Sequence, residues 1–233
     1  MKVLLFCFLN IIYVFGVKVP TGNTTNKNSL NIGNKYGDTP LHLSIFRGYH
    51  NITRLLISAG ADVDVKNENG NTPLHYAVIY KNILALRLLL EKNANPNVVN
   101  QFKETPLYLT VVNNQFESSK LLVKYGAMIN TTDKSPTTAA IVKDRVHIMK
   151  IFLDIGININ EKFDNSYLIT KAIQYGANKI TRLLIESGAD LSVKNDNDES
   201  LLYSTIYSGN LELAELIINQ TSIKEDDVYP DVY

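Results

Sequence analysis

The sequence predicts an all-α fold of stacked helix–turn–helix units with projecting β-turn loops, which are called fingers below. The motif T-P-L-H starts at Thr39 and Thr72, and its variant T-P-L-Y starts at Thr105, so both intervals are 33 residues long. Apolar residues follow each motif at helical spacing, and segments rich in Asn, Asp and Gly separate the units. One helix pair is too small to bury its apolar stripes, so neighbouring pairs are expected to stack as a solenoid.

The first unit, residues 34–66, gives the template for the others. Thr39 suits the N-cap of a helix, and Pro40 suits the first helical position, where its missing N–H costs nothing. Gly48 and Gly60 supply the left-handed residues that end the first and second helices. The expected apolar stripes are Leu41, Ser44 and Ile45 in the first helix and Ile52, Leu55, Leu56 and Ala59 in the second.

Six units fit this template over residues 34–221. The fourth lacks three residues near Asn130 to Lys134, so its finger is expected to be shorter. The fifth has lost the T-P-L-H residues, and the sixth carries Tyr203 where histidine would fall. The unit boundaries are expected near 34–66, 67–99, 100–131, 132–161, 162–194 and 195–221.

The repeated T-P-L-H, the G-A-D segment at residues 60–62 and the 33-residue period closely resemble the ankyrin repeat family. The resemblance covers about residues 34–221. It implies antiparallel helix pairs with β-turn fingers, an L-shaped cross-section and a non-enzymatic role in binding a protein partner. It also implies that His42 and His75 are structural hydrogen-bonding residues that tie neighbouring loops together.

The two ends of the chain differ from the repeats. Residues 3–17 carry no charge, and this run has the length of a signal-peptide apolar region but is shorter than the about 20 residues of a membrane span. We expect a signal peptide over 1–16, a polar linker over 17–33 and a secreted protein. Retention of the apolar run as a membrane anchor is the alternative. Residues 222–233 form an acidic, flexible tail, which either solubilises the chain or docks through Tyr229 and Tyr233.

The composition and motifs argue against several kinds of function. Lys+Arg and Asp+Glu both number 23, so no global charge favours nucleic acid. Cys7 is the one cysteine, which excludes a disulfide framework and a cysteine metal site. His50 and His147 are isolated, and no phosphate-binding loop or hydrolase motif occurs. We therefore predict no catalytic residue, metal, cofactor or small-molecule substrate, and membrane contact only if the apolar run is retained.

Four Asn-x-Ser/Thr sequons are candidate glycosylation sites. They lie at Asn23, Asn51, Asn130 and Asn219. They would carry glycans only if the protein is secreted by a eukaryotic cell, and a chain rich in Asn and Thr also produces such sequons by chance.

The resemblance places partner contacts on the concave face, at the finger tips and at the exposed positions of each first helix. Aromatic residues and Arg, which dominate binding hot spots, recur there. Several of these rings could instead pack between fingers. The expected contact residues are Tyr36, Phe46, Arg47, Asn69, Ile79, Tyr80, Phe102, Glu104, Asn113, Phe163, Tyr175 and Tyr207.

The sequence thus predicts an exported, non-enzymatic protein–protein interaction module. Three alternatives stay open: a secreted effector or venom-type protein that acts on host proteins, a membrane-tethered ankyrin scaffold, and an enzyme or enzyme regulator that needs a partner chain.

Overall fold

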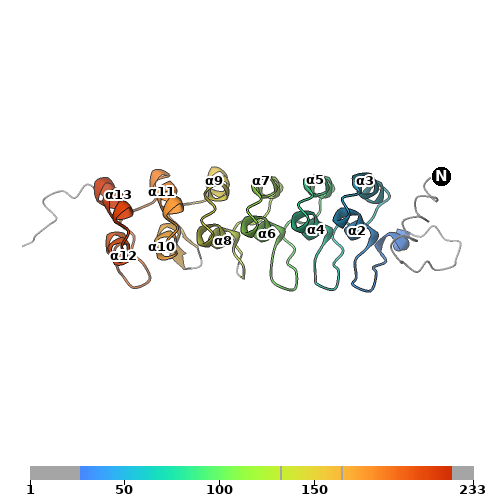
Figure 1. The fold of residues 1–233 in the computed structure, drawn as a ribbon, viewed down its shortest axis with the longest axis horizontal. Coiled ribbons are helices and arrows are strands. Elements are labelled where there is room, and N and C mark those ends of the chain that lie inside the picture. Colours follow the sequence, from blue (N-terminus) through green and yellow to red (C-terminus); the bar gives the residue numbers. More distant parts are fainter. Residues whose placement is uncertain (1–26, 132, 164, 222–233) are drawn as a thin grey trace, which may run out of the picture. The chain divides into compact units, whose positions relative to one another are not determined.

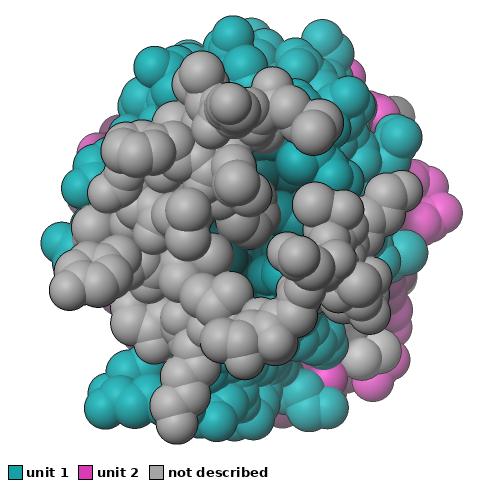
Figure 2. Space-filling view, turned by 90° about the vertical axis from the view of Figure 1, so that its right-hand side faces the viewer, with its two compact units in different colours: residues 1–128 teal, residues 129–233 magenta. Residues whose placement is uncertain are grey.

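A computed structural model describes residues 27–131, 133–163 and 165–221. The chain divides into two compact units, residues 1–128 (unit 1) and 129–233 (unit 2), which are shown in different colours in Figure 2. The predicted signal peptide, the predicted tail and Asn23 lie outside the described residues.

The described residues of unit 1 form three helix pairs, with their first helices in one row and their second helices in another (Figure 1). The fingers protrude beside the row of first helices (Figure 1). A short 3-10 helix, η1 (Lys27–Asn31), contacts α2 and buries Leu30, although it falls within the predicted linker. The pairs are α2 (Pro40–Phe46) with α3 (His50–Ser58), α4 (Pro73–Ile79) with α5 (Ile83–Glu91), and α6 (Pro106–Val112) with α7 (Phe116–Lys124).

The first helices of unit 1 form as the sequence predicts. Thr39 is an extended N-cap with Pro40 at the start of α2, and the same arrangement recurs at Thr72. Gly48 and Gly60 take positive φ angles of 70° and 90° after α2 and α3. The leucines of the motif, Leu41, Leu74 and Leu107, are fully buried.

The buried stripe of α3 differs from the predicted one. Thr53, Leu56 and Ile57 are buried, whereas Ile52, Leu55 and Ala59 are half-buried. A hydrogen bond of 2.9 Å joins the Thr53 and Ser44 hydroxyls inside the helix pair. This bond satisfies the buried hydroxyl of Thr53 and turns that face of α3 toward α2.

Unit 2 also shows three helix pairs in the part of it that the structure describes, and Phe152 and Ile148 are fully buried among them. The finger of the fifth repeat is a hairpin, in which β1 (Lys162–Phe163) pairs antiparallel with β2 (Ser166–Tyr167). The pairs are α8 (Pro136–Val142) with α9 (Val146–Asp154), α10 (Leu168–Gln174) with α11 (Asn178–Glu186), and α12 (Leu201–Tyr207) with α13 (Leu211–Thr221).

The fourth repeat enters α8 by a short connection. The carbonyl of Ile129 accepts from the backbone N–H of Thr137 at 3.0 Å and from its hydroxyl at 2.7 Å. The Ser135 hydroxyl donates to the side chain of Asn130 at 3.1 Å. These bonds close the loop without the full finger of the preceding repeats.

Among residues 27–131, 133–163 and 165–221, no helix is both long and apolar enough to cross a membrane.

Candidate protein-binding surface

Two buried histidines of unit 1 connect the first helices α2 and α4 to the finger of the next repeat. The Thr39 N–H donates to Nδ1 of His42 at 3.2 Å, and Nε2 of His42 lies 3.1 Å from the carbonyl oxygen of Asn71. The same bonds join His75 to Thr72 and to the carbonyl of Glu104, at 3.2 and 3.1 Å. Because Nδ1 accepts, Nε2 carries the proton and donates to the carbonyl. The structural role that the resemblance implied for both histidines is therefore confirmed.

Burial fixes the protonation state of these histidines. It lowers the pKa of His42, and it lowers the pKa of His75 to about 4. The cause is desolvation, which disfavours the charged imidazolium. Both rings are fully buried. At neutral pH they are neutral structural groups.

An asparagine at the start of each finger orders its turn. Asn67 accepts from the N–H groups of Asn69 and Asn71 at 3.0 and 2.9 Å, and its Nδ2 donates to Asp38 at 2.8 Å. Asn100 accepts in the same way from Phe102 and Glu104, at 2.9 and 3.0 Å. The fingers are thus held by hydrogen bonds both within and between repeats.

Neighbouring fingers also touch through their backbones. The Glu68 N–H donates to the Tyr36 carbonyl at 3.1 Å, and the Gln101 N–H donates to the Asn69 carbonyl at 3.0 Å. Gly70 has a φ of 73°, and a Cβ there would lie 2.9 Å from the Gln101 nitrogen. Glycine is therefore required for the close approach as well as for the turn. The exposed finger side chains consequently project from a preformed backbone.

A cluster of rings links the fingers to the ends of the first helices. The rings of Phe46 and Tyr80 pack edge to face with their centres 4.7 Å apart, and the ring centres of Tyr80 and Tyr76 are 5.3 Å apart. The Tyr76 hydroxyl donates to Asp38 at 2.6 Å, and the Arg47 guanidinium lies 5.1 Å from the centre of the Phe46 ring. Such pairs add to the energy of area burial. The rings are thus held in place although Phe46 and Tyr80 are 42% and 43% exposed.

The predicted residues of unit 1 occupy two adjoining positions. Tyr36, Asn69 and Phe102 are exposed in the fingers, while Phe46, Arg47, Ile79, Tyr80 and Asn113 are exposed at the ends of the first helices. We call these eight residues, together with Tyr76, the finger–helix surface. Glu104 instead serves the finger network, because its carboxylate accepts from Asn100 at 3.2 Å.

Sequence reasoning missed Tyr76, which anchors the ring cluster. Tyr76 lies in α4, four residues before Tyr80, which caps the C-terminal end of that helix, so the two side chains share one helix face. That spacing was the available signal. Burial and the hydrogen bond to Asp38 raise the pKa of its hydroxyl, which stays protonated and donates.

A groove of about 360 Å³ adjoins this surface in unit 1. Its lining includes the cations Arg47 and Lys81 together with His50, and no acidic residue. The full lining is Ile45, Phe46, Arg47, Gly48, His50, Tyr80, Lys81, Asn82, Ile83 and Leu84.

The remaining predicted contact residues belong to unit 2. Phe163 is half-buried in β1, Tyr175 is exposed at the end of α10, and Tyr207 is 86% exposed at the end of α12. Among the described residues, these three rings do not contact one another as Phe46 and Tyr80 do in unit 1. Tyr207 instead stacks on Tyr203, with the ring centres 6.4 Å apart.

The candidate glycosylation sites that fall among the described residues lie at the surface. Asn51, Asn130 and Asn219 are exposed, whereas Thr53 of the Asn51 sequon is fully buried. In the part of the chain that the structure describes, no three His, Cys, Asp or Glu residues are grouped to hold a metal ion.

Comparison with known sequences identifies the repeats. A family model described as ankyrin repeats (3 copies) matches residues 16–100 and 86–163. An ankyrin repeat protein of Borreliella burgdorferi is 33% identical over 108 residues, which are 46% of this chain and 47% of that protein. An ankyrin repeat-containing protein of Schizosaccharomyces pombe is 32% identical over 80 residues, which are 32% of this chain and 37% of that protein. The chain thus spans less than half the length of these relatives.

Solved structures share the fold. The human ASB11 ankyrin repeat domain has a TM-score of 0.64 at 22% identity, covering 78% of this chain and 84% of that one. An ankyrin repeat domain from Acinetobacter baumannii has a TM-score of 0.69 at 20% identity, covering 78% and 97%. The ankyrin repeat domain of Bcl-3, a member of the IkappaB family, has a TM-score of 0.67 at 27% identity, covering 85% and 86%.

These likenesses confirm the all-α ankyrin solenoid predicted from the 33-residue period. Ankyrin repeats generally serve as protein–protein interaction modules, and theirs is a non-enzymatic fold. By its helix pairs, its fingers and the extent of the family match, the chain belongs to the ankyrin repeat family.

Proposed function

We propose that this chain is an exported module that captures a protein partner through its finger–helix surface. The observation that carries the proposal is the ring cluster of Phe46, Tyr76 and Tyr80. Phe46 and Tyr80 are exposed, and they pack on each other and on half-buried Tyr76, whose hydroxyl bonds to Asp38. Rings held in one conformation lose little side-chain entropy on binding, which favours affinity. Exposed aromatic residues beside an Arg have the composition of a binding hot spot.

The fingers support the same proposal. Tyr36 and Phe102 are 55% and 61% exposed at finger positions whose backbones bond to each other. Large apolar side chains that gather on one face commonly mark a protein interface. A partner laid along unit 1 would therefore contact finger tips and helix ends together.

The test is affinity capture followed by measurement with the purified partner. Phe46→Ala combined with Tyr80→Ala should weaken binding by about 100-fold, because two hot-spot rings are removed. Tyr125→Ala is the matched control, because Tyr125 is 36% exposed at the end of α7, away from the finger–helix surface. Equal affinities of the double variant and the control would contradict the proposal.

Export rests on the uncharged run at residues 3–17 and on the signal-peptide length of that run. N-terminal sequencing of the protein recovered from culture medium should give a start near Val17. A chain that stays in the membrane fraction with Met1 intact would contradict export and support the membrane-tethered scaffold.

A further inference from the structure

A second groove lies wholly within unit 2 and has a different character. It occupies about 670 Å³, a size typical of binding pockets, between the helices α10 and α12 and the finger of the sixth repeat. Its lining is Thr170, Ile173, Gln174, Asn195, Asp196, Asn197, Glu199, Ser204, Tyr207 and Ser208.

Hydrogen bonds fix the finger that forms one wall of this groove. Asn195 accepts from the N–H groups of Asn197 and Glu199 at 2.9 and 3.0 Å. Its Nδ2 donates to the Glu199 carboxylate at 2.7 Å and to the Ser204 hydroxyl on α12 at 3.1 Å. The Ser166 hydroxyl lies 2.9 and 2.8 Å from the two carboxylate oxygens of Asp196. The wall is therefore preformed, and both carboxylates have defined positions.

The groove is negatively charged. Asp196 and Glu199 line it, and no Lys or Arg does. Asp198 in the same finger forms an ion pair with Lys194 at 2.9 Å. Lys171 on α10 is buried and is not part of the lining. The carboxylates consequently disfavour an acidic segment or a phosphate backbone as the occupant and favour a cation.

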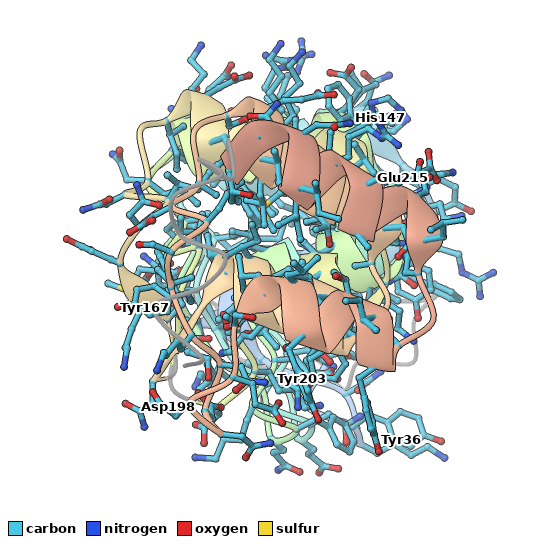
Figure 3. All side chains as sticks on the ribbon, turned by 90° about the vertical axis from the view of Figure 1, so that its left-hand side faces the viewer. Tyr36, His147, Tyr167, Asp198, Tyr203 and Glu215 are labelled. Atoms are coloured by element: carbon cyan, nitrogen blue, oxygen red, sulfur yellow. The ribbon has the colours of Figure 1, made fainter. Side chains whose placement is uncertain are left out.

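Two tyrosines stand on the same side of α12 as the finger. Tyr203 and Tyr207 stack with their ring centres 6.4 Å apart and their planes at 14°. Tyr203 and Asp198 lie on the side of α12 away from α13, which carries Glu215 (Figure 3). Tyr207, which also lines the groove, is 86% exposed. A ring face next to carboxylates attracts a guanidinium or ammonium group through both cation–π and charge interactions.

We propose that this groove binds an extended segment of the protein partner that carries arginine or lysine side chains. The carboxylates of Asp196 and Glu199 receive the cationic groups, and Tyr207 covers the aliphatic part of one side chain. The inference rests on the proposed function, since it names the chemistry of a partner segment, but it uses residues outside the finger–helix surface.

The test is isothermal titration calorimetry of the purified chain with a capped nine-residue peptide of glycine and serine that contains three alternating arginines. The matching peptide with three glutamates is the charge-reversed probe. We expect the arginine peptide to bind and its affinity to fall as the salt concentration rises. We expect no binding of the glutamate peptide. Absence of arginine-peptide binding, or equal binding of both peptides, would overturn the inference.

Variants locate the binding. Asp196→Asn with Glu199→Gln should weaken arginine-peptide binding about tenfold, and the amide oxygens can still accept the finger hydrogen bonds. Tyr207→Ala should weaken it about threefold. The control, Glu186→Gln with Glu215→Gln, removes the same charge from exposed positions of α11 and α13 and should change affinity less than twofold. Equal losses of arginine-peptide affinity in the two double variants would show an effect of net charge alone and would overturn the proposed groove site.

The outcome is separable from that of the proposed function. Phe46→Ala with Tyr80→Ala should leave arginine-peptide binding unchanged, because both residues lie in unit 1. Loss of partner capture in that variant with retained peptide binding supports both proposals. If the wild-type chain captures a partner but does not bind the arginine peptide, only the groove proposal is overturned.

Discussion

The two units are built from similar helix pairs but differ in how their first helices are attached to the fingers. In unit 1, His42 and His75 bond the first helices α2 and α4 to the following fingers, and Asn67 and Asn100 order the finger turns. In unit 2, Asn195 still orders the last finger, but α10 begins at Leu168 without the Thr-Pro start, and an exposed Tyr203 stands at the histidine position of the sixth repeat. The comparison teaches that the helix pairs depend on their buried stripes, whereas the motif serves to attach the fingers.

The grooves of the two units also differ in charge. The unit 1 groove is lined by Arg47 and Lys81 and has no acidic residue, while the unit 2 groove is lined by Asp196 and Glu199 and has no Lys or Arg. Similar backbones thus present opposite charges. Fold-level likeness alone therefore says little about which partner each groove selects.

The largest expected difference between the units concerns the histidine position. His75→Ala should lower the free energy of unfolding by about 3 kcal/mol, because it leaves a cavity and removes the partners of the Thr72 N–H and the Glu104 carbonyl. Tyr203→Ala, at the matching position of the sixth repeat, should cost less than about 1 kcal/mol because Tyr203 is 53% exposed. Urea denaturation measures both, and similar losses would refute the contrast.

The next difference concerns two glycines. Gly70→Ala should cost about 2 to 3 kcal/mol, since the new Cβ meets the Gln101 backbone nitrogen at 2.9 Å and φ is 73°. Gly188→Ala has a similar φ of 88° but no atom within 4 Å, so only the strain of about 1 kcal/mol remains. Thermal denaturation of the two variants checks this. If Gly188→Ala lowered the stability as much as Gly70→Ala, the close approach of the fingers at Gly70 would add nothing to the loss.

The smallest effect is a pH dependence. Because the pKa of His75 is lowered to about 4 from the ordinary 6.5, its contribution is fully present above pH 6.5 and declines as pH falls toward 4. Between pH 7 and pH 5 the loss is about 2 kcal/mol.

A double comparison isolates this effect. The difference in unfolding free energy between wild type and His75→Gln should shrink by that amount at pH 5. A wild-type advantage that stays constant with pH would contradict the neutral state of His75.

Much of the fold followed from the sequence because the period and the helix starts are local signals. Thr39, Pro40 and Gly48 mark the limits of α2 in the sequence itself, and the structure agrees. The buried stripe of α3 was misjudged because Thr53 is polar. Its burial depends on a hydrogen bond to Ser44, nine residues away, which no helical pattern reveals.

The candidate site was less predictable for a related reason. Exposed aromatic positions such as Phe46 and Tyr80 could be found by repeat position alone. The anchoring role of Tyr76 depends on Asp38, 38 residues earlier, and the network role of Glu104 depends on its contact with Asn100. The unit 2 groove lies between α10, α12 and a finger whose Asp196 is held by Ser166 of β2, so its charge emerges only in three dimensions.

Hydrogen–deuterium exchange of the chain with and without its captured partner tests the central claim most directly. Partner binding should protect the finger and first-helix segments of unit 1, around residues 34–47, 67–80 and 100–113. Protection confined to the second helices, His50–Ser58, Ile83–Glu91 and Phe116–Lys124, would contradict it.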